Sequence, residues 1–410
     1  MIARYNFIFL LLSTFSLFSK ISLEPFDFSL SGYIKGELYA DSRQTTSALE
    51  DDLNYFPAQQ ILDPVGQDIN ARAYTIMDAF ETRTRLSMKG PSYGDFSINA
   101  MIETDFEIFT KTIINNMELR HAFFTIQYGQ ATFLFGQTWH PVVFVEAPTI
   151  NYNGATPYDY YARSPQFTFT YQTHHSLDVV LSAGMEGDFV SDGPNGPTNQ
   201  YMRWATTPNM HLQLRWFFYN HVMAVGADYK RIAPRLESDK GFKVHERLSS
   251  GTALWYLSLK WPTVEILSKI NFGQNAFGYN GLGGYAVERN SVNPITGEQQ
   301  YTNLNNIACW TDISLVKYPH LIPALFCGFA KNLKASKDID LLQPIYAFAP
   351  NVDTTFRISS RVSGKVNNMT FSGEIEYTRA YYGTVTSSGG VIDTSSVDCV
   401  RCTFASYYFF

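Results

Sequence analysis

Arginine and carboxylate side chains recur at alternate positions in several segments, where apolar residues fill the positions between them. If these segments are extended, the charged side chains of each one share a face. A guanidinium group binds a carboxylate through a planar fork of donors, so a row of arginines suits anionic solutes. The arginines of this pattern are Arg83, Arg85, Arg120, Arg215, Arg357 and Arg361, and the acidic residues are Glu81, Glu103, Asp105, Glu118, Glu374 and Glu376.

Two interpretations of this charged face remain open from the sequence. The arginines could form a ladder that selects solutes, with the opposing carboxylates creating a transverse field. Alternatively, the two signs could neutralise each other as cross-strand pairs that only stabilise a wall. Acidic residues are as abundant as basic ones in this pattern, which therefore favours neither interpretation.

The elements that must position these residues are strands, because apolar and polar residues alternate along most of the chain. Turn signals divide the chain into about sixteen segments, an even number typical of bacterial barrels. Short connections alternate with long ones, as tight periplasmic turns and longer external loops do in outer-membrane barrels. The predicted strands are 26–40, 72–90, 94–108, 116–129, 131–140, 165–174, 176–187, 209–218, 221–232, 246–260, 263–277, 306–318, 322–333, 352–366, 369–382 and 397–410, and the predicted long connections are 41–71, 141–164, 188–208, 233–245, 278–305, 334–351 and 383–396.

Composition narrows the class of protein. The chain has 410 residues, with 31 Lys and Arg against 37 Asp and Glu, and its net charge of −6 argues against a nucleic-acid-binding protein. Aromatic residues make up 16% of the chain, which excludes disorder, and no apolar run is long enough for a membrane-spanning helix. Because ionised groups are costly in a dry core, the charged face must be hydrated. It lines a water-filled barrel or covers one side of a soluble two-layer sheet.

The N-terminal residues predict export. Arg4 precedes an apolar stretch from Phe7 to Phe18, which is long enough for a signal peptide and too short to span a bilayer. We therefore expect a signal peptide over residues 1–22, cleaved between 16 and 22, and a barrel over residues 23–410. The alternative is a buried strand or helix at the start of a domain.

The C-terminal residues favour the barrel over the soluble sheet. Tyr408 and Phe410 lie on one face of the last predicted strand, and a terminal aromatic residue has no packing advantage in a soluble domain. The pair resembles the signal that the barrel-assembly machinery reads. We therefore expect an all-β protein, a closed antiparallel transmembrane β-barrel of about sixteen strands, surrounded by lipid in the Gram-negative outer membrane.

The connection 141–164 is the best candidate for a constriction inside the barrel. It is long, contains prolines and carries an aromatic cluster, so an inward fold suits it better than solvation. The alternative is an external loop packed at the axis of a trimer. The candidate constriction residues are Tyr152, Tyr158, Tyr160, Tyr161 and Arg163.

No pattern points to a cofactor, a metal ion or catalysis. Cys399 and Cys402 form a C-x-x-C, but no second pair completes a zinc ribbon. Positions i and i+3 of a strand point to opposite faces, which also separates these two thiols. Cys309 and Cys327 fit best as small apolar residues on the lipid face. The histidines are scattered and no nucleophile signature accompanies them, so we expect neither an enzyme nor a bound cofactor.

Several motifs resemble segments of the DcaP-like family of trimeric Gram-negative porins. They are the segments 136–139 (GQTW), 163–167 (RSPQF), 208–215 (PNMHLQLR) and 373–380 (GEIEYTRA). The resemblance implies a homotrimer and an aqueous passage for small hydrophilic solutes, often anionic ones such as dicarboxylates. It does not extend to the coiled coil with which family members often begin, because a predicted strand starts here at about Phe26. The alternatives are a structural or receptor-type barrel plugged by loops and, less favoured, a barrel enzyme.

Overall fold

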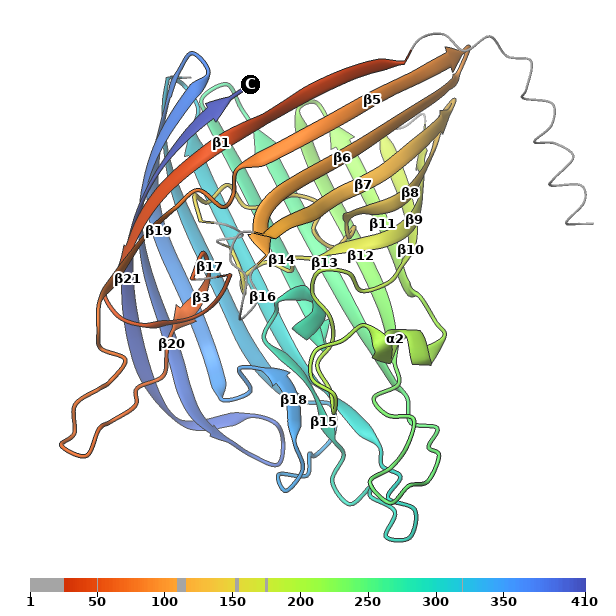
Figure 1. Ribbon diagram of the computed structural model, residues 1–410, viewed down its shortest axis with the longest axis vertical. Coiled ribbons are helices and arrows are strands. Elements are labelled where there is room, and N and C mark those ends of the chain that lie inside the picture. Colours follow the sequence, from red (N-terminus) through yellow and green to blue (C-terminus); the bar gives the residue numbers. More distant parts are fainter. Residues whose placement is uncertain (1–25, 50, 109–115, 152–154, 174–175, 319) are drawn as a thin grey trace, which may run out of the picture.

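The computed structural model describes residues 26–410 except 50, 109–115, 152–154, 174–175 and 319. This part of the chain forms a closed antiparallel barrel of 16 strand positions (Figure 1), with β4 and β5 sharing one of them. Each of the predicted strands is present. The wall consists of β1 (Asp27–Asp41), β4 (Tyr74–Asp78), β5 (Arg83–Tyr93), β6 (Phe96–Ile108), β7 (Asn116–Tyr128), β8 (Ala131–Trp139), β9 (Arg163–Gln172), β10 (Leu177–Gly184), β11 (Asn209–Phe218), β12 (His221–Ile232), β13 (Leu248–Lys260), β14 (Val264–Gln274), β16 (Tyr301–Leu315), β17 (Leu321–Ala335), β19 (Val352–Val366), β20 (Met369–Val385) and β21 (Val391–Phe409).

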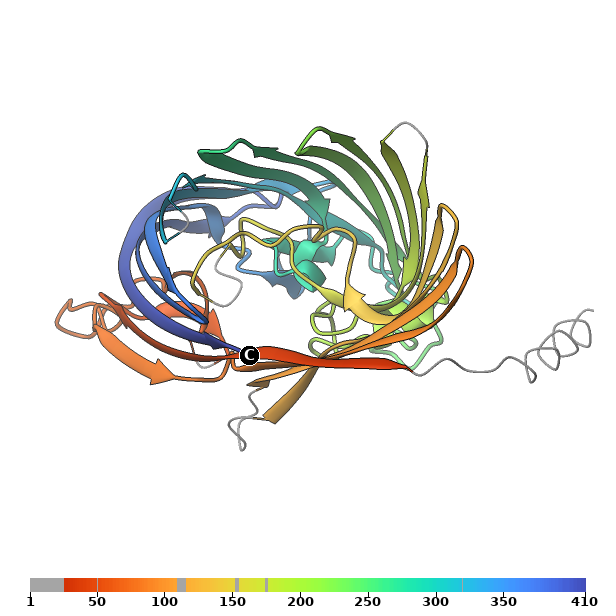
Figure 2. The ribbon, with the colours of Figure 1, turned by 90° about the horizontal axis from the view of Figure 1, so that it is seen from above.

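The first and last strands close the ring (Figure 2). β1 pairs with β21 on one side, and with β4 and β5 on the other. Gly32 and Phe410 exchange two backbone hydrogen bonds of 3.2 Å at this seam. A β-carbon on Gly32 would lie 2.1 Å from the carbonyl oxygen of Arg83, so the close approach of β1 to β5 requires glycine.

The two faces of the wall differ in polarity, as alternation predicts. Along β20 the side chains of Phe371 and Ile375 point outward and are exposed, whereas Glu374 and Glu376 point inward and are buried. A strand that alternates in this way places its apolar residues against lipid and its polar residues inside the barrel.

The connections are short at one end of the barrel and mostly long at the other, which lies at the bottom of Figure 1.

One predicted connection is wrong. β20 and β21 continue as a paired hairpin to Val385 and Val391, so the loop predicted over 383–396 is reduced to 386–390. The long connections also contain elements that the sequence did not predict: the hairpin of β2 (Thr45–Ala48) and β3 (Leu53–Pro57), the strands β15 (Gly283–Val287) and β18 (Ile345–Phe348), and the helices α2 (Gln200–Ala205) and η2 (Ala276–Tyr279).

The four cysteines are free thiols. Cys309 lies opposite Phe329 and Cys327 lies opposite Thr311, so the two thiols miss direct register, as predicted. Cys399 is buried and Cys402 is exposed, because they point to opposite faces of β21. Among the described residues, no helix has the length and apolar character needed to span a membrane.

A charge on the outward face should distinguish a lipid-facing wall from a soluble barrel. Ile375 on β20 is 57% exposed, and Ile61 in a loop is 53% exposed. We expect Ile375→Arg to lower the free energy of unfolding in vesicles by about 2–4 kcal/mol, the cost of an arginine at the bilayer midplane. Urea titration of vesicle-inserted protein measures this change. Ile61→Arg is the matched control and should have almost no effect, and equal tolerance of both variants would contradict a lipid-facing wall.

Candidate functional site

The loop 140–162, between β8 and β9, lies inside the barrel, and Figure 2 shows it crossing the interior of the ring. Its apolar side chains are buried against the wall and against the β3 hairpin. This inner cluster includes Val142, Val143, Ala155, Tyr158 and Tyr160 of the loop, Leu53, Tyr55 and Phe56 of the hairpin, and Tyr256, Trp310, Phe326 and Tyr382 of the wall. The inner cluster therefore occupies the interior beside the strands from β12 to β21.

The two ends of the loop are joined where the first two family-like motifs meet. Trp139, at the end of β8, lies opposite Arg163, at the start of β9. Gln166 donates to the carbonyl oxygen of Trp139 at 2.7 Å, and the guanidinium groups of Arg120 and Arg163 lie 5.6 and 5.5 Å from its ring centroid. Gly136 has a φ of +127°, and a β-carbon there would lie 2.2 Å from a backbone oxygen, so this position requires glycine. The two motifs thus form the neck of the inward loop.

Buried polar contacts fasten the middle of the loop to the far wall. Asp159 forms an ion pair with Lys269 of β14, and the Lys269 ammonium also donates to the carbonyl oxygen of Val143 at 3.0 Å. Tyr158 shares a hydrogen bond of 3.1 Å with Thr355 of β19. A buried charge is tolerated when it is paired and its other donors are satisfied. These contacts therefore fix the position of the loop across the barrel.

A second set of contacts fastens the loop near the seam. The backbone amide of Ile150 donates to Glu374 at 2.8 Å, and the side-chain amide of Asn151 donates to Glu376 at 2.9 Å. Lys35 of β1 donates to the carbonyl oxygen of Ile150 at 3.1 Å. Glu374 and Glu376 therefore hold the loop, and they are not free to bind solutes.

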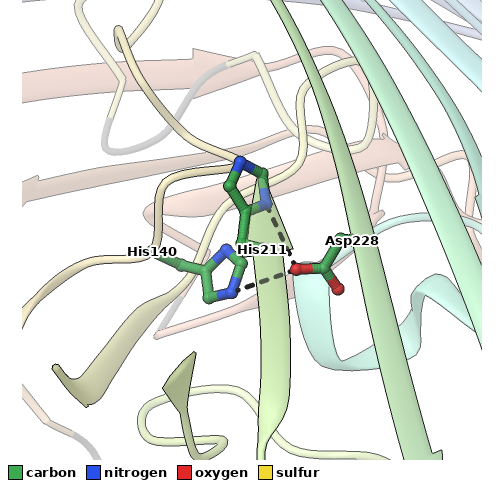
Figure 3. Close-up of side chains that lie close together, drawn as sticks. All are labelled: His140, His211 and Asp228. Atoms are coloured by element: carbon green, nitrogen blue, oxygen red, sulfur yellow. Dashed lines mark hydrogen bonds and ion pairs between the residues drawn. The ribbon is translucent and has the colours of Figure 1, made fainter. Parts of the chain in front are cut away.

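A carboxylate between two imidazoles anchors the start of the loop (Figure 3). Asp228 Oδ2 on β12 lies 3.4 Å from His140 Nε2 and 3.2 Å from His211 Nδ1 on β11. Tyr279 donates to Asp228 Oδ1 at 2.8 Å. His140 Nδ1 accepts the backbone amide of Val142 at 3.1 Å, so in the neutral ring the proton sits on Nε2 and points at Asp228. Hydrogen bonds therefore account for this cluster, although its three groups are of the types that ligate metal ions.

The predicted arginines near the neck are all paired with carboxylates. Arg120 lies 3.1 Å from Glu103 and 2.6 Å from Asp105. Arg83 lies 3.6 Å from Glu103, and Arg85 lies 2.6 Å from it. Arg83 also pairs with Glu81, and Arg163 pairs with Glu118 and with Asp188. We call the following nine residues, together with Glu146 of the loop, the neck network: Glu81, Arg83, Arg85, Glu103, Asp105, Glu118, Arg120, Arg163 and Asp188.

The remaining predicted arginines lie elsewhere. Arg357 is buried under the β3 hairpin, where it donates to the carbonyl oxygen of Asn54 at 3.0 Å. Arg361 lies 3.0 Å from Asp312, and the Arg215 guanidinium lies 4.4 Å from the ring centroid of Phe144. The structure thus separates the predicted arginines into groups and does not align them as one ladder.

Other predicted residues are placed as follows. Tyr158, Tyr160 and Tyr161 are buried, and Tyr152 lies outside the described residues. Tyr408 and Phe410 are exposed at the end of the last strand. The sequence missed Asp159, Asp188, Glu146 and Asp312 as partners or lining groups, because no alternation marks loop residues and no spacing links Asp312 to Arg361.

A polar space remains between the loop and β5. A cavity of about 90 Å³ there is lined by Glu81, Arg83, Glu146, Tyr161 and Tyr407, among others. A second cavity of about 490 Å³ lies toward the end with the short turns. Both cavities are lined by Thr149, Ile150 and Tyr407, so they adjoin each other beside the loop.

Comparison with known proteins shows the fold. No family model matches the chain, and no curated protein matches it. The crystal structure of the outer membrane channel DcaP of Acinetobacter baumannii is similar over 94% of this chain and 97% of that chain, with a TM-score of 0.69 and 17% identity. The anion-selective porin from Comamonas acidovorans is similar over 94% and 100%, with a TM-score of 0.55 and 8% identity.

The trimer form of OmpT, an outer membrane protein of Vibrio cholerae, is similar over 94% of this chain and 100% of that chain, with a TM-score of 0.56 and 10% identity. At such low identities the likeness concerns architecture. The chain therefore has the barrel fold of these outer-membrane proteins.

The pair of Asp159 and Lys269 should control how firmly the loop is held. Lys269→Met leaves a buried carboxylate without its partner, and we expect it to lower the free energy of unfolding by about 3–5 kcal/mol. The double variant Lys269→Met with Asp159→Asn should recover part of this loss, because it removes the uncompensated charge. Urea titration of both variants measures the difference, and an additive loss would show that the two residues do not interact.

Proposed function

We propose that this protein is an outer-membrane porin, a water-filled channel for passive diffusion of small hydrophilic solutes. The observation that carries the proposal is a closed barrel with an apolar outer face whose interior holds an inward loop beside a partly exposed charged network. A static narrowing of this kind limits the size of the solutes and leaves the chemistry of the wall to select among them.

The passage runs on the side of the loop that faces β5 to β9. The inner cluster fills the opposite side with buried apolar groups. On the β5 side, the side chain of Arg85 is 47% exposed and those of Arg83 and Glu81 are partly exposed. Ionised groups in a lumen keep contact with water, so their exposure marks the wet side. Glu118 and the buried Arg163 lie beside this lining at the neck of the loop.

The likeness to outer-membrane channels supports the same proposal and extends it to assembly. One of the similar structures is described as a trimer, and we propose that this chain also forms a homotrimer. Residues 1–22 act as a cleaved signal peptide in this proposal, and Tyr408 and Phe410 act as the signal for the barrel-assembly machinery. Surrounding lipid contacts the apolar face of the wall.

A loop-plugged barrel without an open passage is the second candidate. It is favoured by the inner cluster, in which the loop and the β3 hairpin bury side chains deep inside the ring. A structural or receptor role would then replace transport. The expectation that the chain is not an enzyme stays a prediction.

Conductance separates the two candidates. We expect the purified, folded protein to insert into planar bilayers and to give ohmic current steps in 1 M KCl, a screening concentration at which the Debye length is about 3 Å. Liposomes that contain the protein should swell in small sugars at a rate that falls with sugar size. Protein that inserts, as shown by its heat-dependent mobility on gels, but carries no current would overturn the porin proposal and favour the plugged barrel.

A further inference from the structure

The charge along the proposed passage is not balanced. In the neck network the acidic residues Glu81, Glu103, Asp105, Glu118, Glu146 and Asp188 outnumber the basic residues Arg83, Arg85, Arg120 and Arg163. Lys35 and Glu37 of β1, which join the network through Glu81, add one charge of each sign and leave the excess unchanged. A lumen lined by an excess of one sign, with walls of low dielectric constant, concentrates ions of the opposite sign.

Three of the four guanidinium groups are engaged by two or more carboxylates, and Arg85 is the exception, with a side chain 47% exposed and one carboxylate partner, Glu103 at 2.6 Å. Arg120 is buried and bonded to two carboxylates, at 3.1 and 2.6 Å. Arg163 is buried and paired with two carboxylates as well. Arg83 lies within 4 Å of Glu81, Glu103 and Asp105. A guanidinium whose donors are already used by carboxylates has little left to offer a passing anion.

Glu146 is the carboxylate of the neck network that these ion pairs do not include. It lies on the inward loop, it is exposed to solvent, and it borders the small cavity opposite Glu81 and Arg83. Among the described residues it forms no ion pair within 4 Å, whereas every other member of the neck network has such a partner. The narrowed part of the passage therefore presents one uncompensated negative charge on the loop and paired charges on its wall.

We propose that the passage prefers cations to anions, and that Glu146 is the residue that sets this preference. The inference rests on the proposed porin function and deepens it by naming the class of solute: small cations, including inorganic monovalent ions and protonated amines. It runs against the anionic preference that the family resemblance implies, because the arginines of the neck network are paired with carboxylates here.

The reversal potential of the current tests the proposal. In a KCl gradient across a planar bilayer, the wild-type protein should show a potential of the sign that K⁺ permeation produces. Glu146→Gln should lower the permeability ratio of K⁺ to Cl⁻ roughly two- to fivefold, the Boltzmann factor of one charge about 4 Å from an ion in water.

The matched control is Glu237→Gln, which removes the same charge from an exposed position on an external loop. It should leave the permeability ratio and the conductance unchanged. Swelling of liposomes in a protonated amine and in a dicarboxylate of similar size extends the test to organic solutes, and the amine should enter several-fold faster.

The outcomes separate the two proposals. Protein that inserts but gives no current overturns the porin function itself. An open channel with a reversal potential of the Cl⁻ sign leaves the porin function intact and overturns the cation preference. A cation-selective channel whose permeability ratio does not change in Glu146→Gln overturns the role of Glu146. A reduced ratio in Glu146→Gln together with an unchanged ratio in Glu237→Gln supports both parts of the inference.

Discussion

A charged group inside the barrel is stable only when water or an opposite charge is within reach, and this constraint organises the interior. Where the interior is packed, every charge has to be paired, as Lys269 and Asp159 are. Where it is wet, charges remain partly exposed, as Arg85 is. Burying an unpaired ion costs several kcal/mol of desolvation free energy, which is more than a single surface contact contributes to stability. The distribution of pairs and exposed charges therefore marks the boundary between filled and open space.

The inward loop satisfies this constraint from both of its sides. Its apolar residues join the inner cluster, while its backbone and polar groups bond to Glu374, Glu376 and Lys269 on the wall. The cluster around Asp228 fastens the start of the loop, and the contacts of Trp139 with two guanidinium groups fasten its neck. Several independent attachments hold the loop in one position, so the narrowing that it creates is a fixed feature of the fold.

The strands could be predicted from the sequence because alternation is a local property. Each of the predicted strands is present, and β19 has the predicted bounds of 352–366. The loop over 383–396 was not predictable in the same way, because Thr394–Ser396 read as turn residues although pairing with β20 makes them a strand. His211 and Asp228 are register partners in the β11–β12 hairpin, but His140 joins them only because the loop folds inward. Asp312 and Arg361 lie on β16 and β19, which β17 separates, and no spacing in the sequence marks their ion pair.

The same distinction explains why counting charged residues on strands was not enough to predict selectivity. Strand residues that face inward are subject to the stability of the wall, which favours neighbouring opposite charges and so cancels the field of an arginine that is paired in this way, as Arg120 is. A residue on the loop is free of that requirement when its side chain is solvated, as Glu146 is. Its charge can be changed without leaving a buried partner uncompensated. In a barrel of this kind, the need for a stable wall therefore determines most of the charged residues on the strands. The net field in the passage is determined by the few solvated charged groups that do not contribute to the stability of the wall.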